Sequence, residues 1–536
     1  MAEHKSGSRP VGGGPMGDGP GGGAPVEKAN NFGKSIYQLV SYCKKYYSVV
    51  ILAAVLSIAG TIFNIIGPDK LSDMTNRITN GIMTGIDLDG IAKIAYVLVT
   101  LYGFGFVFNL IQGFIMATVT QKISKSLRSD ISEKINRLPL AYFDRTSTGD
   151  VLSRVTNDVD TIGQSLNQSL SSLISSITMF IGSIVMMFAT NWTMAVAGIF
   201  ATLIGFGFMM VIVSKSQKYF VQQQKELGEI NGQIEETYTG HNVVKAYNGE
   251  KKEILSFSKM NKTLYECSWK SQFMSGLMMP LMSFVGNLGY VVVCVVGAIL
   301  VKKDITSFGT IVAFMMYIRL FTQPLSQIAQ SVTSLQSTAA ASERVFDFLE
   351  EEELVGESNK KKHLETAQGN VEFSHVHFGY HTKKTIINDF SVMVKSGQKI
   401  AIVGPTGAGK TTMVNLLMRF YEISSGEIKI DGVSIKELTR ENIHHLFGMV
   451  LQDTWIFEGT VKENIVYSKQ GVTDEEVIAA SKAVGLHHYV KTLPKGYDTV
   501  LDDKASLSAG QKQLVTIARA MIENAPMLIL DEATIP

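Results

Sequence analysis

The sequence predicts two joined parts of different fold class, an α-helical membrane domain and a following α/β domain. Only 18% of the 536 residues are charged, whereas soluble proteins average about 25%. Uncharged stretches longer than about 20 residues, enough to cross a bilayer, recur before about residue 330. After about residue 350, charged residues return and short β-rich runs alternate with helical patterns. The average composition therefore conceals a very apolar part and a soluble part.

The helical part contains six candidate membrane spans. The window 161–214 carries no charge and is long enough for two spans, with a break at Asn191 and Trp192. The last span contains Arg319, a charge that is costly inside a membrane. We expect it to face the substrate cavity and an anionic or amphipathic ligand. A structural ion pair would explain a charged residue at this position equally well. The expected spans are residues 47–67, 94–118, 169–190, 192–214, 275–301 and 307–330.

Lysine and arginine are distributed unevenly around these spans, and cytoplasmic loops carry an excess of both. Six precede the first span, seven lie in the loop after the second and nine in the loop after the fourth. The opposite loops hold three, none and two. These counts place both termini and the two long loops in the cytoplasm, and apolar residues at helical spacing predict that the long loops are helical.

Charge and cysteine content exclude other classes of protein. The formal net charge is +1, from 49 basic and 48 acidic residues, which argues against a general nucleic-acid-binding surface. Three cysteines are too few for a disulfide framework or a four-cysteine zinc site. The charge balance therefore argues against nucleic acid as a partner, and the long uncharged spans make the lipid bilayer an expected one.

The α/β part contains a phosphate-binding pattern, GxxxxGK[ST]. Residues 399–403 are typical of a buried strand, and an apolar helical pattern follows the loop. Glycines let backbone N–H groups surround phosphate oxygens, Lys410 reaches the β- and γ-phosphates, and Thr411 offers its hydroxyl to Mg²⁺. The loop and the first turn of its helix are Gly404, Pro405, Thr406, Gly407, Ala408, Gly409, Lys410, Thr411 and Thr412.

Two further elements follow in the chain. A second strand-like run, residues 527–530, ends at Asp531, where an acid beside a phosphate-binding loop suits the surroundings of Mg²⁺. The next acid, Glu532, is placed to polarise an attacking water. A Ser-x-Gly turn at a helix start precedes this strand and is typical of an anion site or of an ordinary cap. Its residues are Leu507, Ser508, Ala509, Gly510 and Gln511.

The order of these motifs resembles the ATP-binding domain of ABC transporters. Gln452 lies between the phosphate-binding loop and the LSAGQ signature, and Tyr380 matches the family's adenine-stacking aromatic residue. Six spans fused to one such domain resemble an exporter-type half-transporter, and residues 142–150 and 240–247 resemble its two cytoplasmic loops.

This resemblance implies ATP-driven export of an amphipathic small molecule, drug or lipid-like, across the plasma membrane of a bacterium. ATP and Mg²⁺ are the implied cofactors; Glu532 would be the catalytic base, and Thr411, Gln452 and Asp531 would surround the metal. Two ATP-binding domains face head to tail in this family, so residues 507–511 would contact ATP held by a partner subunit. The alternative functions are a subunit that binds ATP and gates its partner without hydrolysis, and an ATP-gated channel.

The sequence departs from the family pattern at two important places. Ala509 stands where the family usually has glycine, which resembles one subunit of heterodimeric multidrug-type exporters and favours a heterodimer over a homodimer. The sequence stops at Pro536, before the family's remaining motifs, so we expect a fragment with little ATPase activity; the alternative is a genuine short form. The expected parts are a disordered Gly/Pro-rich tail (1–30), a transmembrane domain (31–345), a linker (346–368) and an incomplete ATP-binding domain (369–536).

Overall fold

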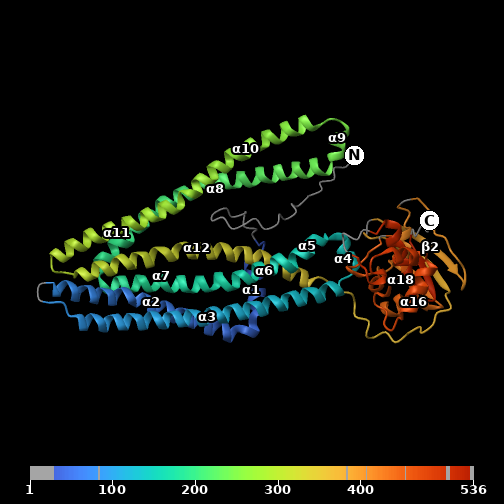
Figure 1. Ribbon diagram of the computed structural model, residues 1–536, viewed down its shortest axis with the longest axis horizontal. Helices are drawn as coiled ribbons and strands as arrows, with labels where there is room; N and C mark the ends of the chain where they lie inside the picture. The colour runs from blue at the N-terminus through green and yellow to red at the C-terminus, as the bar shows by residue number, and fades with distance from the viewer. Residues whose placement is uncertain are drawn as a thin grey trace. The chain divides into compact units, whose positions relative to one another are not determined.

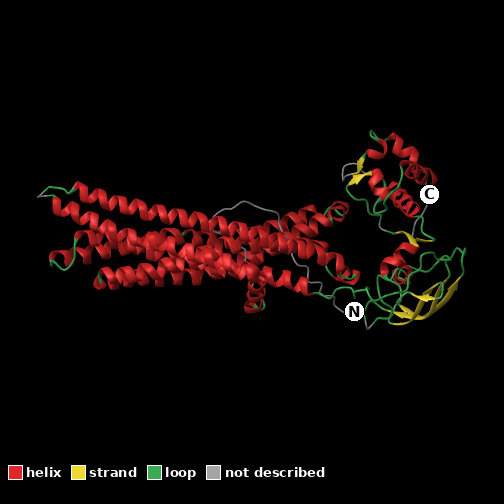
Figure 2. Cartoon of the chain, turned by 90° about the horizontal axis from the view of Figure 1, so that it is seen from below, coloured by secondary structure: helices red, strands yellow, loops and turns green. Residues whose placement is uncertain are grey.

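The computed structural model describes residues 29–82, 85–381, 384–405, 407–452, 454–501 and 507–531. Contacts divide the chain into two compact units. The first comprises Met1–Ile135 and Gly149–Glu351, and the second comprises Asn136–Thr148 and Glu352–Pro536. The described part of the first unit is built from helices, whereas all described strands belong to the second unit (Figure 2).

Six helices in the described residues of the first unit are long and apolar enough to cross a membrane, as the sequence predicts (Figure 1). Several continue well past the apolar window, and the buried residues Ile123, Leu127 and Ile131 keep helical spacing in one such extension. The helices of this unit are α1 (Phe32–Tyr42), α2 (Tyr47–Gly81), α3 (Leu88–Arg137), α5 (Thr148–Ser153), α6 (Val159–Gln164), α7 (Leu170–Thr190), α8 (Trp192–Thr239), α9 (His241–Ala246), α10 (Glu250–Gly276), α11 (Met278–Lys302) and α12 (Phe308–Glu350).

The helices of the first unit pack in two groups. Helices α2, α7 and α12 pack against one another, while α8 packs along α10 and α11 (Figure 1). The core of α12 is formed by the fully buried side chains of Phe314 and Tyr317, whose rings meet edge to face. At the turn between α7 and α8, the side chain of Asn191 accepts hydrogen bonds from the backbone N–H groups of Thr193 and Met194, both at 3.1 Å. This cap satisfies two of the free N–H groups at the start of α8.

Two π-helical turns, η2 (Arg154–Asp158) and η3 (Ser165–Ser169), interrupt the helix that leads into α7. At the first, the buried Asp158 accepts a hydrogen bond of 3.0 Å from Nε of Arg344 on α12. At the second, the Ser169 hydroxyl donates to that of Ser334 on α12 at 2.7 Å. The hydrophobic periodicity of the sequence does not reveal these turns, because a π turn adds only one residue to a helix that remains continuous.

The second unit is built around an antiparallel four-stranded sheet and two short strand pairs. The sheet has the order β2-β1-β3-β4, and the fully buried side chains of Ile428 and Ile430 on β3 form one core with Leu416. A second core, which includes Val515, gathers most of the remaining helices. The strands are β1 (Val371–Phe378), β2 (Ile387–Val394), β3 (Ser425–Ile430), β4 (Val433–Ser434), β5 (Phe447–Val450), β6 (Gly459–Thr460), β7 (Val500–Leu501) and β8 (Met527–Leu530). The helices are α4 (Leu140–Arg145), α13 (Lys410–Leu417), α14 (Arg440–Leu446), α15 (Val461–Val466), α16 (Asp474–Ala483), α17 (Leu486–Thr492) and α18 (Ala509–Glu523).

The sequence predicts a buried strand at residues 399–403, and this prediction is wrong. The structure forms no strand there, and Ile400, Ile402 and Val403 are exposed, Val403 to 86%. In the part of the chain that the structure describes, no strand pairs with this segment. An apolar run is compatible with a buried strand, but it becomes one only where neighbouring strands supply hydrogen bonds and cover its side chains.

Candidate nucleotide-binding site

The phosphate-binding loop leads directly into α13. Gly407 and Gly409 have φ angles of +83° and +91°, a left-handed backbone conformation that strains other residues. Gly409 is the last residue before the helix, and the N–H of Ala408 donates to the Pro405 carbonyl at 3.1 Å. The loop therefore turns tightly and brings the free N–H groups at the start of α13 toward one side, where an anion is favoured. Thr406 lies outside the described residues.

Lys410 is the first residue of α13, and its side chain reaches back across the loop. Its Nζ donates to the carbonyl oxygens of Gly404 at 3.0 Å and Pro405 at 3.3 Å. These contacts place the ammonium group over the loop, where it is available to phosphate oxygens. The positive charge and the N–H groups of the loop thus act on the same region.

The parallel pairing of β5 with β8 brings the acidic strand end to this loop. Val450 pairs with Leu530, and the N–H of Asp531 donates to the Val450 carbonyl at 3.0 Å. Asp531 is only 7% exposed, and its Oδ1 accepts a hydrogen bond of 3.4 Å from the Thr411 hydroxyl. A hydroxyl and a carboxylate that meet beside a phosphate-binding loop fit the few oxygen ligands that Mg²⁺ takes from proteins.

The other residues predicted near the metal are less well placed. Gln452 lies just beyond β5 and is exposed. Glu532, the predicted catalytic base, lies outside the described residues. The structure therefore brings together Thr411 and Asp531 but gives no geometry for the attack of water.

Tyr380, predicted to stack on adenine, lies beside the start of α13. Its hydroxyl donates to that of Thr412 at 3.3 Å and accepts from the Asn415 side-chain amide at 3.5 Å. Its ring packs edge-on against Phe378, at 5.0 Å between centroids, and against Tyr421, at 4.9 Å. Tyr380 as a whole residue is 39% exposed, which leaves surface on which a base can stack.

The signature residues form the start of α18. Ser508 is the N-cap: its hydroxyl accepts from the Gln511 N–H at 3.2 Å, and the Gln511 side chain accepts from the Ser508 N–H at 2.8 Å. This reciprocal pair is a capping box, and the buried Leu507 anchors it in the second core. Ser508, Ala509 and Gly510 are exposed.

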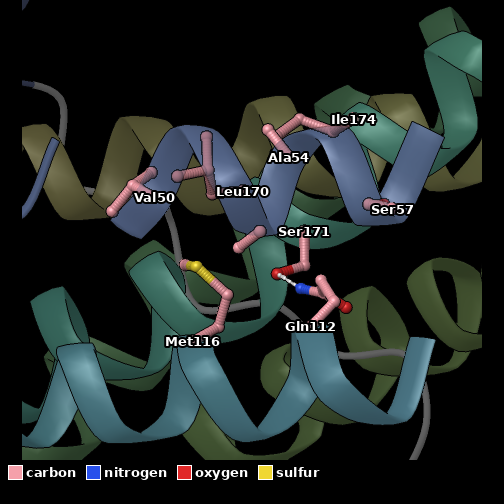
Figure 3. A pocket seen from close by; sticks show the side chains of 9 residues that line it. Val50, Ala54, Ser57, Gln112, Met116, Leu170, Ser171 and Ile174 are labelled. Atoms are coloured by element: carbon pink, nitrogen blue, oxygen red, sulfur yellow. Dashed lines mark hydrogen bonds between the residues drawn. The ribbon is translucent and has the colours of Figure 1, made fainter. Parts of the chain in front are cut away.

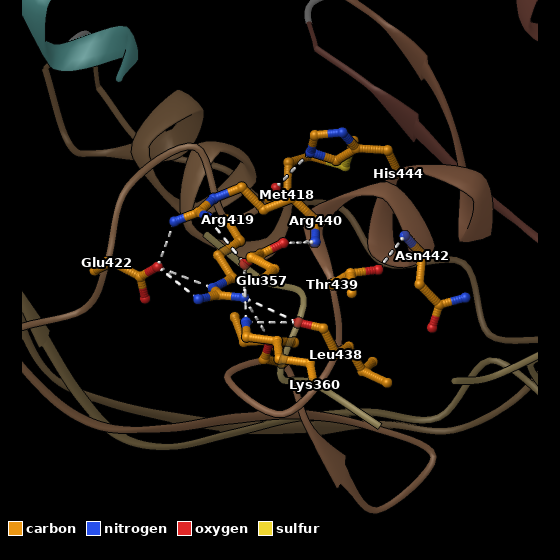
Figure 4. A network of polar contacts seen from close by, with 11 residues as sticks. Glu357, Lys360, Met418, Arg419, Glu422, Leu438, Thr439, Arg440, Asn442 and His444 are labelled. Carbon is orange, nitrogen blue, oxygen red and sulfur yellow. Dashed lines mark hydrogen bonds and ion pairs between the residues drawn. The ribbon is translucent and has the colours of Figure 1, made fainter. Parts of the chain in front are cut away.

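A polar network that the sequence does not reveal secures the other end of α13 (Figure 4). Arg419 follows α13 with a φ of 54°, and its Nη1 donates to the carbonyl oxygens of Ile435 at 3.2 Å and Leu438 at 3.0 Å. The same Nη1 lies 2.9 Å from Oε1 of Glu357, which also accepts from Nη1 of Arg440 at 2.9 Å. The network therefore fixes the chain segment after α12 to the helix that carries the phosphate-binding loop.

Within the membrane unit, Arg319 lies exposed on α12, and no side-chain partner is found for it among the described residues. One cavity lies between α2, α3 and α7, where the Gln112 amide donates to the Ser171 hydroxyl at 2.8 Å (Figure 3). Its volume is about 10 Å³, room for about one water molecule and not for a transported molecule. This cavity is therefore a packing feature of the bundle.

Comparison with known proteins agrees with this arrangement. The family model of the ABC transporter transmembrane region matches residues 50–325, and the ABC transporter family model matches residues 387–535. The chain is 37% identical over 548 residues to the fatty acid ABC transporter ATP-binding/permease protein of Mycobacterium bovis, with 95% of this chain and 86% of that protein covered. The chain belongs to the ABC transporter family.

Other relatives of this ABC transporter extend the comparison. It is 35% identical over 508 residues to the uncharacterized ABC transporter ATP-binding protein YfiC of Bacillus subtilis, covering 95% and 83% of the two chains. It is 30% identical over 424 residues to the ATP-dependent lipid A-core flippase of Syntrophus aciditrophicus, covering 79% and 70%. The fused membrane and ATP-binding domains make it an exporter-type half-transporter, a multi-pass plasma-membrane protein of ATPase-coupled transport.

Proposed function

We propose that this ABC transporter uses Mg²⁺ and ATP to export an amphipathic, lipid-like molecule, as one half of a dimer. The main support for a nucleotide site is the hydrogen bond from the Thr411 hydroxyl to the buried Asp531 carboxylate beside the phosphate-binding loop. The names of two relatives, a fatty acid transporter and a lipid A-core flippase, support a lipid-like cargo.

Each residue around the loop has a definite role in this proposal. Lys410 neutralises phosphate charge, Tyr380 stacks on the adenine, and the free N–H groups at the start of α13 hold the phosphate oxygens. Thr411 and Asp531 would hold Mg²⁺, and Gln452, just after β5, would be a further oxygen ligand. When bound there, Mg²⁺ would supply positive charge that offsets the phosphate charge during phosphoryl transfer. Glu532, next in the chain, orients and deprotonates the attacking water.

The dimer supplies the other side of the ATP site. The exposed start of α18, with Ser508 and Gly510, contacts the nucleotide that the partner subunit holds. Because Ala509 departs from the usual glycine, the partner in this proposal is a different half-transporter that carries the standard signature. Native mass spectrometry of the complex purified from its own membranes tests this point: a complex with two copies of this subunit would contradict a heterodimer.

Arg319 is the proposed contact for an anionic headgroup. A charge within a span costs at least about 2.5 kcal/mol in lipid, so this side chain is expected to face protein or water. Its exposed position on α12 leaves the guanidinium available to a carboxylate or phosphate of the cargo.

ATP-dependent uptake of a fluorescent long-chain fatty acid by inside-out membrane vesicles tests the function. Vesicles with the complete transporter and its native partner should accumulate the probe with ATP, and Lys410→Ala should abolish the accumulation. Arg319→Gln should reduce uptake of the fatty acid more than uptake of its uncharged methyl ester. Uptake that survives Glu532→Gln would contradict hydrolysis at this site and indicate a subunit that only gates its partner.

A further inference from the structure

The end of α18 that lies away from the signature residues is held by a lysine from the loop after α15. Nζ of Lys469 donates hydrogen bonds to the carbonyl oxygens of Ile522 at 2.5 Å and Glu523 at 3.0 Å. These are the last two residues of α18, where carbonyl groups lack partners within a helix. A cation at this end also interacts favourably with the helix dipole. Lys469 therefore caps α18 from another segment of the chain.

The same loop holds α18 at a second point, about one turn earlier. Nε of Arg519 donates to the Asn464 carbonyl at 2.9 Å, and its guanidinium carbon lies 5.1 Å from the centre of the Tyr467 ring. Tyr467 ends α15 with a φ of 50°, a left-handed conformation that is strained for a tyrosine. Residues 464–469 thus supply both attachments, one at Arg519 and one at the end of the helix.

Two attachment points fix the direction of a helix, whereas a single one leaves it free to tilt. From Arg519 back to Ala509 the helix rises about 15 Å, so a tilt of about 5° moves its start by roughly 1.3 Å. Displacements of about 1 Å in a group that contacts the reacting atoms have large effects on reaction rates. The direction of α18 therefore matters for the residues at its exposed start.

We propose that Lys469 is a positioning residue for the signature, which aims Ser508 and Gly510 at a nucleotide by holding the far end of α18. The inference rests on the proposed function, in which these residues contact ATP held by the partner subunit. Because Lys469 acts through α18, its loss should weaken binding of the nucleotide that the partner holds. ATP held by this chain's own loop, at the start of α13, should bind as before. A role confined to folding would weaken both sites.

Photolabelling with 8-azido-ATP tests this in the complete transporter with its native partner, since the label attaches where the adenine is bound. The two subunits are separated after labelling in the presence of Mg²⁺. In Lys469→Met, which removes the ammonium group, half-maximal labelling of the partner should require about 2- to 30-fold more probe, the range for one cation at a helix end. Labelling of this subunit should stay within twofold of the wild type. Lys469→Arg, which keeps N–H donors, should label the partner nearly as the wild type does.

The matched control is Lys462→Met, which removes the same charge from a surface pair with Asp474 in the same unit and should leave both subunits labelled normally. Wild-type labelling of the partner in Lys469→Met would overturn the role of Lys469 and leave the proposed function intact. Equal loss on both subunits would also overturn it, and would indicate a contribution to folding alone. Failure to label this subunit in the wild type would overturn the proposed function itself.

Discussion

The strongest stability prediction concerns Glu357, whose carboxylate joins the linker to the end of α13. Its Oε1 lies 2.8 Å from Nζ of Lys360 and 2.9 Å from Nη1 of both Arg419 and Arg440. Its Oε2 accepts from the backbone N–H of Arg440 at 2.6 Å. Glu357→Gln removes the negative charge of this carboxylate. The Arg419 side chain, which is only 8% exposed, then loses its ion pair with residue 357.

The magnitude follows from the number of bonds and from what remains after the substitution. Each hydrogen bond between charged groups contributes about 1.5–3 kcal/mol, and breaking a buried ion pair costs about 3–5 kcal/mol. Glutamine keeps an acceptor oxygen, and Glu422 still pairs with Arg419 at 2.8 Å. We therefore expect a loss near the lower limit, about 3 kcal/mol, in the free energy of local unfolding.

Hydrogen exchange of peptides covering residues 410–446 measures this loss in the full chain. A loss of about 3 kcal/mol corresponds to roughly 100-fold faster exchange where opening is at equilibrium. The matched control is Glu437→Gln, which removes the same charge from an exposed pair with Lys362 and should change exchange less than about 5-fold. Exchange in Glu357→Gln within threefold of the wild type would refute the reasoning.

Three further predictions concern single groups. Asp531→Asn should weaken ATP binding in the presence of Mg²⁺ but not in EDTA, and equal loss in both titrations would contradict a metal role. Asn191→Ala removes the cap of α8 and should cost about 1 kcal/mol in thermal unfolding, with Asn191→Asp close to the wild type. Burial lowers the pKa of His444, whose ring contacts the Met418 carbonyl, so the folded state favours the neutral ring and the free energy of unfolding should fall as pH drops below about 6.5. His444→Gln should therefore reduce the dependence of the unfolding free energy on pH between 7 and 5.5. The same pH dependence in the variant and the wild type would contradict this role of His444.

The membrane part was predictable because its signal is local and long. A span requires about 20 apolar residues, and the six helices found are those that the uncharged windows indicate. The phosphate-binding loop was predictable for a similar reason, since Gly407 and Gly409 take left-handed conformations that the pattern requires. The strand that ends at Asp531 forms where the sequence places it, and it meets Thr411.

The contacts that the sequence does not reveal join residues far apart in the chain. Lys469 and Ile522 are separated by 53 positions, and Glu357 and Arg440 by 83, so no periodicity or spacing connects them. The wrong strand at residues 399–403 has a related cause, because a strand depends on partners supplied by other segments. Local patterns identify the chemical groups, whereas tertiary contacts decide what holds them in place.

The most direct test of the whole account is ATP binding to the purified full chain, measured by calorimetry in the presence of Mg²⁺. Loss of one charge-assisted hydrogen bond costs about 1.5–3 kcal/mol, so Lys410→Ala should bind ATP roughly 10- to 150-fold more weakly than the wild type. A wild-type chain that binds no ATP, or a Lys410→Ala variant with unchanged affinity, would contradict the claim that residues 404–412 form the nucleotide site of this transporter.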